Sequence, residues 1–497
     1  MSAKKSPKSK NEGHASHTQD ADIPGLPGKF SRKIKVSFMG AGSFFTPRVL
    51  NDIMKTPGAM GGTFALVDID EKRLKLTTRM IRKLVKGSGW KVEASTDRRE
   101  VLPHSDYIIN CIEVSGAACV ELDNDIPLKY GVDQCIGDTI GPGGLFKSLR
   151  TIPAFLEILR DVEELCPQAI VLNYTNPMSM LCTAAGRVSE IPVVGLCHSV
   201  QGTSNLLARY AGVPYEELAW QCAGINHLAW FTKLEHKGKD LYPKLKKDFV
   251  RQIQKSIAEV DAGKVDPELL SSWSGGSPRE VPDHHQDLVR KDMCVNFGAF
   301  ITESSGHLSE YLPYYRKSEA GRKLLRSGYA GGSRFYASNW PKWRANADKE
   351  RAAILKGEKE MNWERSWEYA AWIIEAREKN TPYRFHGNVM NQPRQGSGLL
   401  ISNLAADQAV EVACLVDGNG VQPTRYGALP PQMAALCASN LAMFGLGAQA
   451  AIERSVETAI HALMLDPLTA AVCTPSQIRD MSLEMFAAEK AYLPDYK

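Results

Sequence analysis

The sequence lacks any pairing pattern among its cysteines. Its 11 cysteines are an odd number, and no two of them stand in a C-x-x-C arrangement. This argues against a zinc ribbon or a disulfide framework. Most of them have apolar neighbours in the sequence, where a cysteine usually serves as a small buried hydrophobic side chain. We therefore expect a protein of a reducing compartment, the cytoplasm.

The sequence also has little net charge and no long apolar run. Its formal net charge is only +4, and much of the excess lies in the first 35 residues, so we expect neither nucleic acid nor a membrane surface as a partner. No stretch approaches 18 consecutive apolar residues, so we expect no membrane-spanning helix. Residues 1–32 contain lysines without a following apolar region, which predicts a disordered tail rather than a secretory signal.

Short apolar runs alternate with helical stretches through the first 200 residues. The runs cover residues 33–39, 64–68, 107–112, 169–173 and 193–197. Helical stretches between them, such as residues 70–86 and 145–166, predict an α/β fold with a parallel, doubly wound sheet. We therefore expect a Rossmann-like domain over residues 33–200. Each run ends in a polar or reactive residue, at the sheet edge where such folds bind ligands.

The strict alternation fades after about residue 200. Residues 362–379 have a helical pattern, residues 403–423 are strand-like, and residues 431–465 form a nearly continuous helical region rich in alanine and leucine. This mixture predicts an α+β domain over residues 201–497, merged with the first domain as in the lactate and malate dehydrogenases. We expect it to serve substrate binding and oligomerisation.

A glycine-rich turn follows the first predicted strand. Gly40, Gly42 and Ser43 form a G-x-G-S turn, and Asp68 ends the second strand. In dinucleotide-binding domains such glycines let the backbone approach the pyrophosphate, and the acid binds the ribose hydroxyls. Phe45 stands where a third glycine would be, so a simple tight turn is the alternative. The surrounding alternation favours a dinucleotide site, and Asp68 favours NAD over NADP because a carboxylate repels a 2′-phosphate. Asp70 is expected to cap the next helix.

Five other polar positions are ambiguous on spacing alone. Cys197 ends a predicted strand and His227 follows a short apolar stretch, but a buried cysteine or a hydrogen-bonded histidine is usually structural. Asp138 lies in the loop GDTIGPGG, where it could equally be a turn residue that caps the helix near residue 145. His284 and His285 are adjacent, so their side chains should point in different directions, towards the surface or a sugar rather than a second metal.

Five segments, taken together and in this order, resemble glycoside hydrolase family four, the NAD- and manganese-dependent glycosidases. They are FMGAGS at residues 38–43, DTIGPGG at 138–144, NYTNPM at 173–178, GLCHSVQGT at 195–203 and GINH at 224–227. The resemblance runs from about residue 33 almost to the end of the chain. CHSVQGT, CAGINH, FITESSGHLSEY and EVACLVDGNGVQPT are most similar to the α-galactosidase branch.

The resemblance implies roles for several residues. Cys197 and His227 would bind Mn²⁺, Asn176 would hold the substrate beside the metal, and Asp138 would lie near the leaving oxygen. The phospho-sugar branch carries Asp or Asn directly after the metal-binding cysteine, whereas this chain has His198. That departure argues against a 6-phosphosugar and makes His198 a candidate substrate contact.

The resemblance also implies a tyrosine as the catalytic base. Tyr311, in the segment GHLSEY, is the first choice, although an aromatic cluster that packs a helix is the alternative. His307, in the same segment, could be a base, a substrate ligand or a group behind the metal ligands. Arg290 and Asn388 are further candidates for contact with the sugar.

The family's reaction is a redox-assisted elimination, an exception to the usual pair of carboxylates. NAD⁺ oxidises C3 of the sugar, a base removes the C2 proton while the metal stabilises the enediolate, the C1 group leaves, water adds and the hydride returns. We therefore expect an α-galactosidase, in a homodimer or homotetramer. The alternatives are another glycoside (α-glucuronide, α-galacturonide, α-glucoside or sulfoquinovoside), an NAD-dependent sugar or hydroxy-acid dehydrogenase, and a non-catalytic NAD sensor.

Overall fold

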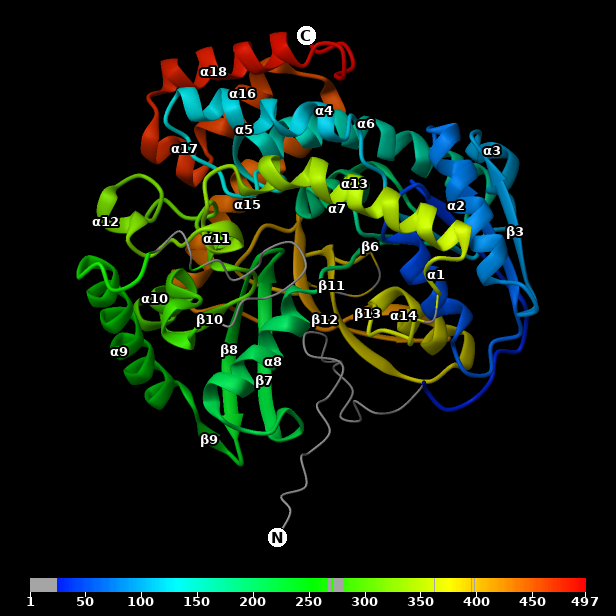
Figure 1. The fold of residues 1–497 in the computed structure, drawn as a ribbon, viewed down its shortest axis with the longest axis horizontal. Coiled ribbons are helices and arrows are strands. Elements are labelled where there is room, and N and C mark those ends of the chain that lie inside the picture. The colour runs from blue at the N-terminus through cyan, green and yellow to red at the C-terminus, as the bar shows by residue number, and fades with distance from the viewer. Residues whose placement is uncertain (1–24, 267–269, 271–280, 362, 395, 397) are drawn as a thin grey trace.

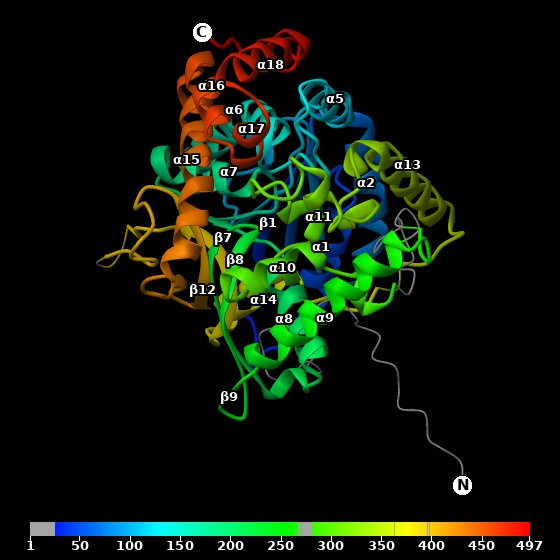
Figure 2. The same cartoon turned by 90° about the vertical axis from the view of Figure 1, so that its left-hand side faces the viewer.

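The computed structural model describes residues 25–266, 270, 281–361, 363–394, 396 and 398–497. Within these residues the strands form one 13-stranded sheet that runs through both halves of the chain. Helices cover the sheet on its two faces, and the C-terminal helices lie together at one end of the molecule (Figures 1 and 2).

The N-terminal half of the sheet is parallel, and its strands follow the order β3-β2-β1-β4-β5-β6. This is the strand order of dinucleotide-binding doubly wound sheets. The predicted fold is therefore confirmed. The strands are β1 (Ile34–Met39), β2 (Gly62–Val67), β3 (Trp90–Ser95), β4 (Tyr107–Asn110), β5 (Ile170–Asn173) and β6 (Val193–Gly195).

Strand β3 was not predicted, because it is the edge of the sheet and is largely polar. Only Trp90 of its six residues is buried, whereas every residue of β4 is buried. The helices of this half are α1 (Thr46–Met54), α2 (Glu71–Leu84), α3 (Arg98–Val101), α4 (Ala117–Val120), α5 (Leu122–Lys129), α6 (Gly141–Leu165), α7 (Met178–Val188) and α8 (Ser199–Ala211). Helix α6 begins four residues before the expected start, with Pro142 in its first turn, where proline favours helix initiation.

The second half extends the sheet with antiparallel strands in the order β6-β11-β12-β7-β8-β10. The joints are narrow: β11 meets β6 at the pair Asn388 and Gly195, and β12 meets β7 at the pair Glu411 and Gly224. These strands are β7 (Leu218–Ile225), β8 (Leu228–His236), β9 (Lys239–Asp240), β10 (Phe300–Ile301), β11 (Tyr383–Met390), β12 (Ala409–Asp417) and β13 (Gly420–Pro423). The sheet thus changes from parallel to antiparallel beside the strand that precedes Cys197.

The helices of the second half surround this antiparallel region. They are α9 (Tyr242–Asp261), α10 (Leu288–Phe297), α11 (Ser305–Leu308), α12 (Glu319–Arg322), α13 (Phe335–Lys356), α14 (Tyr369–Lys379), α15 (Pro431–Glu453), α16 (Val456–Met464), α17 (Pro467–Val472) and α18 (Pro475–Ala488), with short 3₁₀ turns η1 (Tyr215–Glu217), η3 (Asp283–His285) and η4 (Gly328–Ala330). The predicted helix at 431–465 is broken at Arg454, which adopts a left-handed conformation.

Packing begins earlier than the expected boundary at residue 33. Residues 1–24 of the predicted tail lie outside the described residues. Leu26 and Phe30, which we assigned to the tail, are buried, and the Leu26 amide donates to Glu375 Oε1 at 2.8 Å. The Leu26 carbonyl oxygen also accepts from Lys379 Nζ at 2.7 Å, so the chain is bound to α14 from about residue 26.

One helix is long and apolar enough to cross a membrane by length and composition, which the search for an unbroken apolar run missed. It is α15, and 56% of its most apolar window is buried inside the protein. It contacts α6, α7 and α16. This burial is typical of a core helix.

Candidate active site

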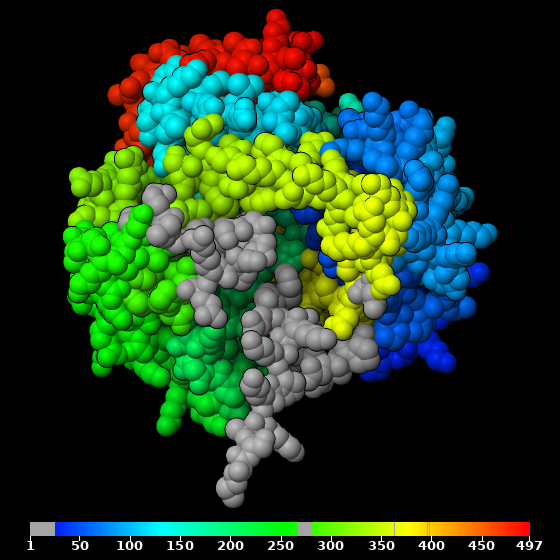
Figure 3. Space-filling model, viewed as in Figure 1, coloured from blue at the N-terminus to red at the C-terminus, as the bar shows by residue number. Residues whose placement is uncertain are grey.

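A cavity of about 830 Å³ opens at the carboxyl ends of the parallel strands, under helix α13. The space-filling view shows the hollow below α13, with surfaces of the N-terminal half at its back (Figure 3). Most of the predicted site residues line it, namely Gly40, Gly42, Ser43, Asp68, Asp138, Asn176, Cys197, His198 and His227. The fold therefore brings together residues that are up to 187 positions apart in the sequence (227 − 40).

The glycine turn is shaped as a dinucleotide site requires. A Cβ atom on Gly40, whose φ is +78°, would lie 2.6 Å from the Cys111 carbonyl oxygen. The Gly42 amide donates to Asp68 Oδ2 at 2.7 Å, and a Cβ on Gly42 would lie 2.6 Å from the same oxygen. Gly40 therefore needs to be glycine, and a side chain at Gly42 would displace the Asp68 carboxylate. Asp70 caps α2 as predicted, because its carboxylate accepts two amides of the first turn.

Phe45 replaces the third glycine of the usual fingerprint without closing the turn. It is the last residue before α1, and its ring packs edge-on against Tyr174 with centroids 4.8 Å apart. Both side chains line the cavity. The departure from the fingerprint thus places an aromatic pair in the cavity wall.

Cys197 and His227 lie together, and a third potential ligand joins them. Cys197 Sγ is 3.3 Å from His227 Nε2, which is 3.5 Å from Glu303 Oε2. The three donor atoms all lie within 4.8 Å of one another. His227 occupies the two-residue turn between β7 and β8 with φ of +64°, a conformation that is rare outside glycine and concentrates at functional sites.

Sequence reasoning missed Glu303. It stands in the segment FITESSGH, which carried the resemblance, but no pattern in the sequence linked it to Cys197. A carboxylate four residues before a candidate histidine was the available signal. Sulfur, nitrogen and oxygen donors together suit a divalent transition metal, so these residues fit the Mn²⁺ that the resemblance implies.

The charges of this cluster reinforce each other. Burial raises the pKa of Cys197, but the positive His227 outweighs it and the net shift is downward. Burial lowers the pKa of His227, but Glu303 and Cys197 raise it to about 10. Burial raises the pKa of Glu303, but the positive His227 lowers it, and the net pKa is about 2. The cluster therefore favours the ionised forms of Cys197 and Glu303 beside a protonated His227, and a divalent cation could take the place of that proton.

His307 and Tyr311 lie behind the His227 ring rather than on the cavity wall. His227 Nδ1 is 3.2 Å from His307 Nε2 and 3.3 Å from the Tyr311 hydroxyl. Burial and the positive His227 lower the pKa of His307 to about 4, and burial raises the pKa of Tyr311 well above its ordinary value. Both groups are therefore neutral and can orient the His227 ring, so that His227 Nε2 points at Cys197 and Glu303.

Asp138 and Asn176 face each other across the cavity wall. Asn176 Nδ2 donates to Asp138 Oδ2 at 3.3 Å, and Thr139 Oγ1 donates to Asp138 Oδ1 at 2.6 Å. Burial would raise the pKa of Asp138, but Lys147 and His307 lower it, so it is a carboxylate. The alternative role as a helix cap is wrong, because α6 begins after Ile140 and no side chain caps it.

Glu310 holds the loop that carries Asp138. Its Oε1 accepts the amides of Cys135, Ile136 and Gly137 at 2.7, 3.0 and 3.1 Å. Because these three amides immediately precede Asp138, the carboxyl group fixes the loop in place.

Other candidates fall elsewhere. Arg290 does not line the cavity: it binds Asp287 at 2.6 Å and Thr203 at 3.1 Å. Asn388 lies within β11, where its Nδ2 donates to the Gly195 carbonyl. His198 does line the cavity, and it pairs with Glu368, which raises its pKa to about 9 against the effect of burial.

His284 and His285 do not point in different directions, so that expectation was wrong. In the turn η3 their rings lie 4.1 Å apart, and their Nε2 atoms are 2.8 and 3.1 Å from Glu259 Oε2. None of the three lines the 830 Å³ cavity.

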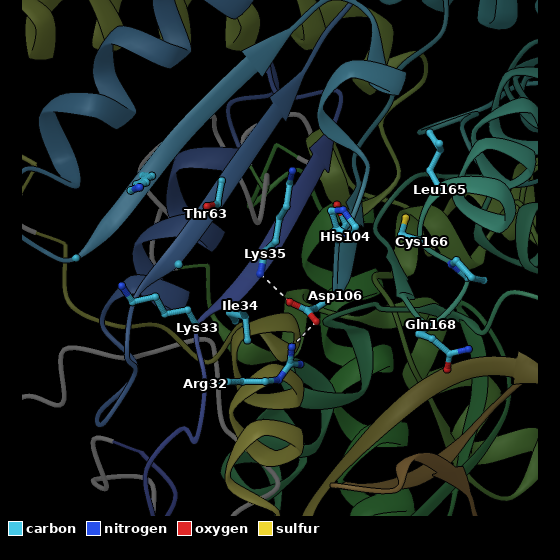
Figure 4. A pocket seen from close by; sticks show the side chains of 15 residues that line it. Arg32, Lys33, Ile34, Lys35, Thr63, His104, Asp106, Leu165, Cys166 and Gln168 are labelled. Atoms are coloured by element: carbon cyan, nitrogen blue, oxygen red, sulfur yellow. Dashed lines mark hydrogen bonds and ion pairs between the residues drawn. The ribbon is translucent and has the colours of Figure 1, made fainter.

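A second cavity, of about 660 Å³, lies at the opposite edge of the sheet, around the amino ends of β1, β2 and β4 (Figure 4). It contains several basic side chains, of which Arg32 pairs with Asp106. None of the predicted site residues lines it. Ligands of doubly wound sheets bind at the carboxyl edge, so the larger cavity is the candidate active site.

Two family models match the chain in succession. The model for family 4 glycosyl hydrolases matches residues 35–213, and the model for the C-terminal domain of the same family matches residues 222–469. The chain belongs to family 4 of the glycosyl hydrolases. This membership identifies a glycosidase and overturns the dehydrogenase and NAD-sensor alternatives.

Relatives of this family 4 hydrolase match most of its length. The α-galactosidase of Bacillus subtilis is 36% identical and covers 93% of this chain and all of its own. The α-galactosidase of Rhizobium meliloti is 35% identical over 93% of this chain and 89% of its own. A solved 6-phospho-α-glucosidase from gut microorganisms, in complex with NAD and Mn²⁺, is 23% identical, with a TM-score of 0.73 over 94% of this chain and all of its own. That last likeness shows the shared fold.

Proposed function

We propose that this family 4 hydrolase cleaves α-galactosides with NAD⁺ and Mn²⁺. The observation that carries the proposal is that Cys197 and His227 line the same cavity as the glycine turn and Asp68, with Glu303 beside them as a third potential metal ligand. The names of the two curated relatives support galactose as the sugar. His198 in place of Asp or Asn supports a substrate without a 6-phosphate.

Each half of the cavity has its own task. Gly40, Gly42, Ser43 and Asp68 would bind the dinucleotide, and the thiolate, imidazole and carboxylate would hold the metal. When bound, NAD⁺ supplies a reversible hydride acceptor and Mn²⁺ supplies a Lewis acid for the sugar oxygens.

The remaining residues would position the sugar and move protons. Asp138, an ionised carboxylate beside Asn176, would accept hydrogen bonds from the sugar or from the attacking water. Tyr311, with His307 beside it, is the proposed site of C2 proton removal. Its hydroxyl is separated from the metal donors only by the His227 ring, so the base role requires that hydroxyl to reach the sugar when substrate binds.

The test is turnover of nitrophenyl glycosides with NAD⁺, Mn²⁺ and a thiol reductant. We expect release of nitrophenol from the α-galactoside with no net NADH, and loss of most activity on chelation or in Cys197→Ser. Matched glucoside, glucuronide, galacturonide and 6-phosphate substrates serve as comparisons. Faster turnover of any of these would contradict the sugar assignment, and net NADH would contradict the redox cycle.

We also propose that the protein acts in the cytoplasm as a homodimer or homotetramer. Light scattering coupled to gel filtration would measure the mass of the assembly. A single species of 54.8 kDa, the mass of one chain, would contradict this proposal.

A further inference from the structure

Helix α13 belongs to the C-terminal half of the chain, yet it runs along the dinucleotide crevice of the N-terminal half (Figures 1 and 3). Its Tyr336 and Trp340 line the cavity near Asp138 and Lys147. Its Asp348 and Arg351 line the same cavity near the glycine turn. Because an α-helix rises about 1.5 Å per residue, α13 covers the length of the crevice from the sugar end to the adenosine end.

Two contacts fix the far end of α13 over the dinucleotide motif. Arg351 is buried, and its guanidinium donates to the Gly42 carbonyl oxygen at 2.7 Å. Asp348 accepts from Arg73 of α2 at 2.8 Å. The helix is thus tied both to the glycine turn and to the helix that follows Asp68.

Arg344 lies midway between these ends and lines the cavity. It is half-buried, and its Nη1 lies 2.6 Å from the position that a Cβ atom on Gly116 would occupy. Gly116 follows β4, the strand paired with β1, so Arg344 faces the crevice from across the glycine turn. Among the described residues, no hydrogen bond or ion pair joins its guanidinium to another side chain.

A guanidinium that lines the cavity without a carboxylate partner is available to bind an anion, and its planar fork of N–H donors suits phosphate oxygens. We propose that Arg344 binds the pyrophosphate of the dinucleotide from the roof of the cavity. The cofactor is then held between the β1–α1 turn below and α13 above. This inference rests on the proposed function, because it takes the ligand of the crevice to be NAD⁺.

The test is NAD⁺ binding without substrate, measured by calorimetry and by energy transfer from Trp340 and Trp343 to NADH. A hydrogen bond to a charged group contributes enough that Arg344→Gln should weaken NAD⁺ about 10- to 100-fold. Arg344→Lys should recover part of that loss. Lys349→Gln, which removes an exposed charge from the same helix, should bind NAD⁺ as the wild type does.

Ligand fragments locate the contact. ADP-ribose, which keeps the pyrophosphate, should weaken with Arg344→Gln as NAD⁺ does, whereas adenosine should bind both proteins equally. Unchanged affinity of the variant for NAD⁺ would overturn the inference, as would a loss confined to the affinity for anionic sugars. If the wild type itself does not bind NAD⁺, the proposed function fails instead. An unchanged melting temperature shows that the variant is folded.

Discussion

The carboxylate of Glu303 shows how the proposed metal site depends on single backbone conformations. Glu303 has φ of +72° and His227 has φ of +64°, so both residues occupy a left-handed region that costs free energy for a side chain. These conformations direct the two side chains at one point beside Cys197. No spacing rule relates positions 197, 227 and 303. Cys197 and His227 could be predicted from the resemblance to a family, whereas Glu303 became evident only in the folded structure.

We expect Glu303→Gln to lower the affinity for Mn²⁺ by more than about 100-fold, because merely losing a group that orients a ligand already costs roughly 10- to 100-fold. Paramagnetic resonance of free Mn²⁺ during titration would measure it. Glu484→Gln, which removes a surface carboxylate from α18, is the control and should leave this affinity unchanged. Equal affinity of Glu303→Gln and the wild type would remove Glu303 from the metal site.

At the scale of elements, the β1–α1 turn was readable from sequence because its function requires glycine. We expect Gly42→Ala to weaken NADH binding about tenfold or more, since its new methyl group would meet Asp68 Oδ2 at 2.6 Å and displace the carboxylate that we propose binds the ribose. Fluorescence titration of NADH would measure it. Gly87→Ala, in a turn with open space around it, controls for a general loss of stability. Normal NADH binding by Gly42→Ala would separate Asp68 from the cofactor.

Helix α13 could not be predicted in the same way. An amphipathic surface helix is recognised by an apolar stripe that faces the core, but the inner face of α13 borders a cavity and mixes Trp340 and Trp343 with Arg344 and Arg351. Pro341 within the helix further weakens the pattern. Strand β3 was missed for a related reason, because an edge strand need not be apolar. A helix that borders a ligand cavity and a strand at the edge of a sheet thus lack the regular apolar spacing by which core helices and strands are recognised.

At the scale of the whole molecule, the two halves are joined by a buried ionic cluster that no local pattern indicates. Arg150 of α6 binds both oxygens of Asp123 of α5, at 2.7 and 3.1 Å, and also pairs with Glu489, which follows α18. All three side chains are almost fully buried. One guanidinium faces two carboxylates, so burial, together with the negative Asp123, raises the pKa of Glu489 to about 9.

The cluster leads to a prediction about stability and its pH dependence. Removing the shared partner in Arg150→Met leaves the buried Asp123 carboxylate uncompensated, which should lower the free energy of unfolding by about 3–5 kcal/mol. The raised pKa of Glu489 has a different effect. Its contribution to stability is fully present below about pH 4.5, where the carboxyl is protonated in both states, and is lost as the pH rises towards 9, by up to about 1.4 kcal/mol per pH unit.

Glu489→Gln cannot ionise, so it should be free of this loss and should gain stability relative to the wild type as the pH rises from 5 to 9. Urea unfolding at several pH values would measure the difference for both variants. Glu484→Gln, which removes a surface carboxylate from α18 that pairs with Lys129, controls for the change of charge. A difference between Glu489→Gln and the wild type that stays constant with pH would mean that Glu489 is ionised in the folded protein. In that case Arg150 neutralises both carboxylates, and the C-terminal helix is held to the dinucleotide-binding half by a complete ion triad.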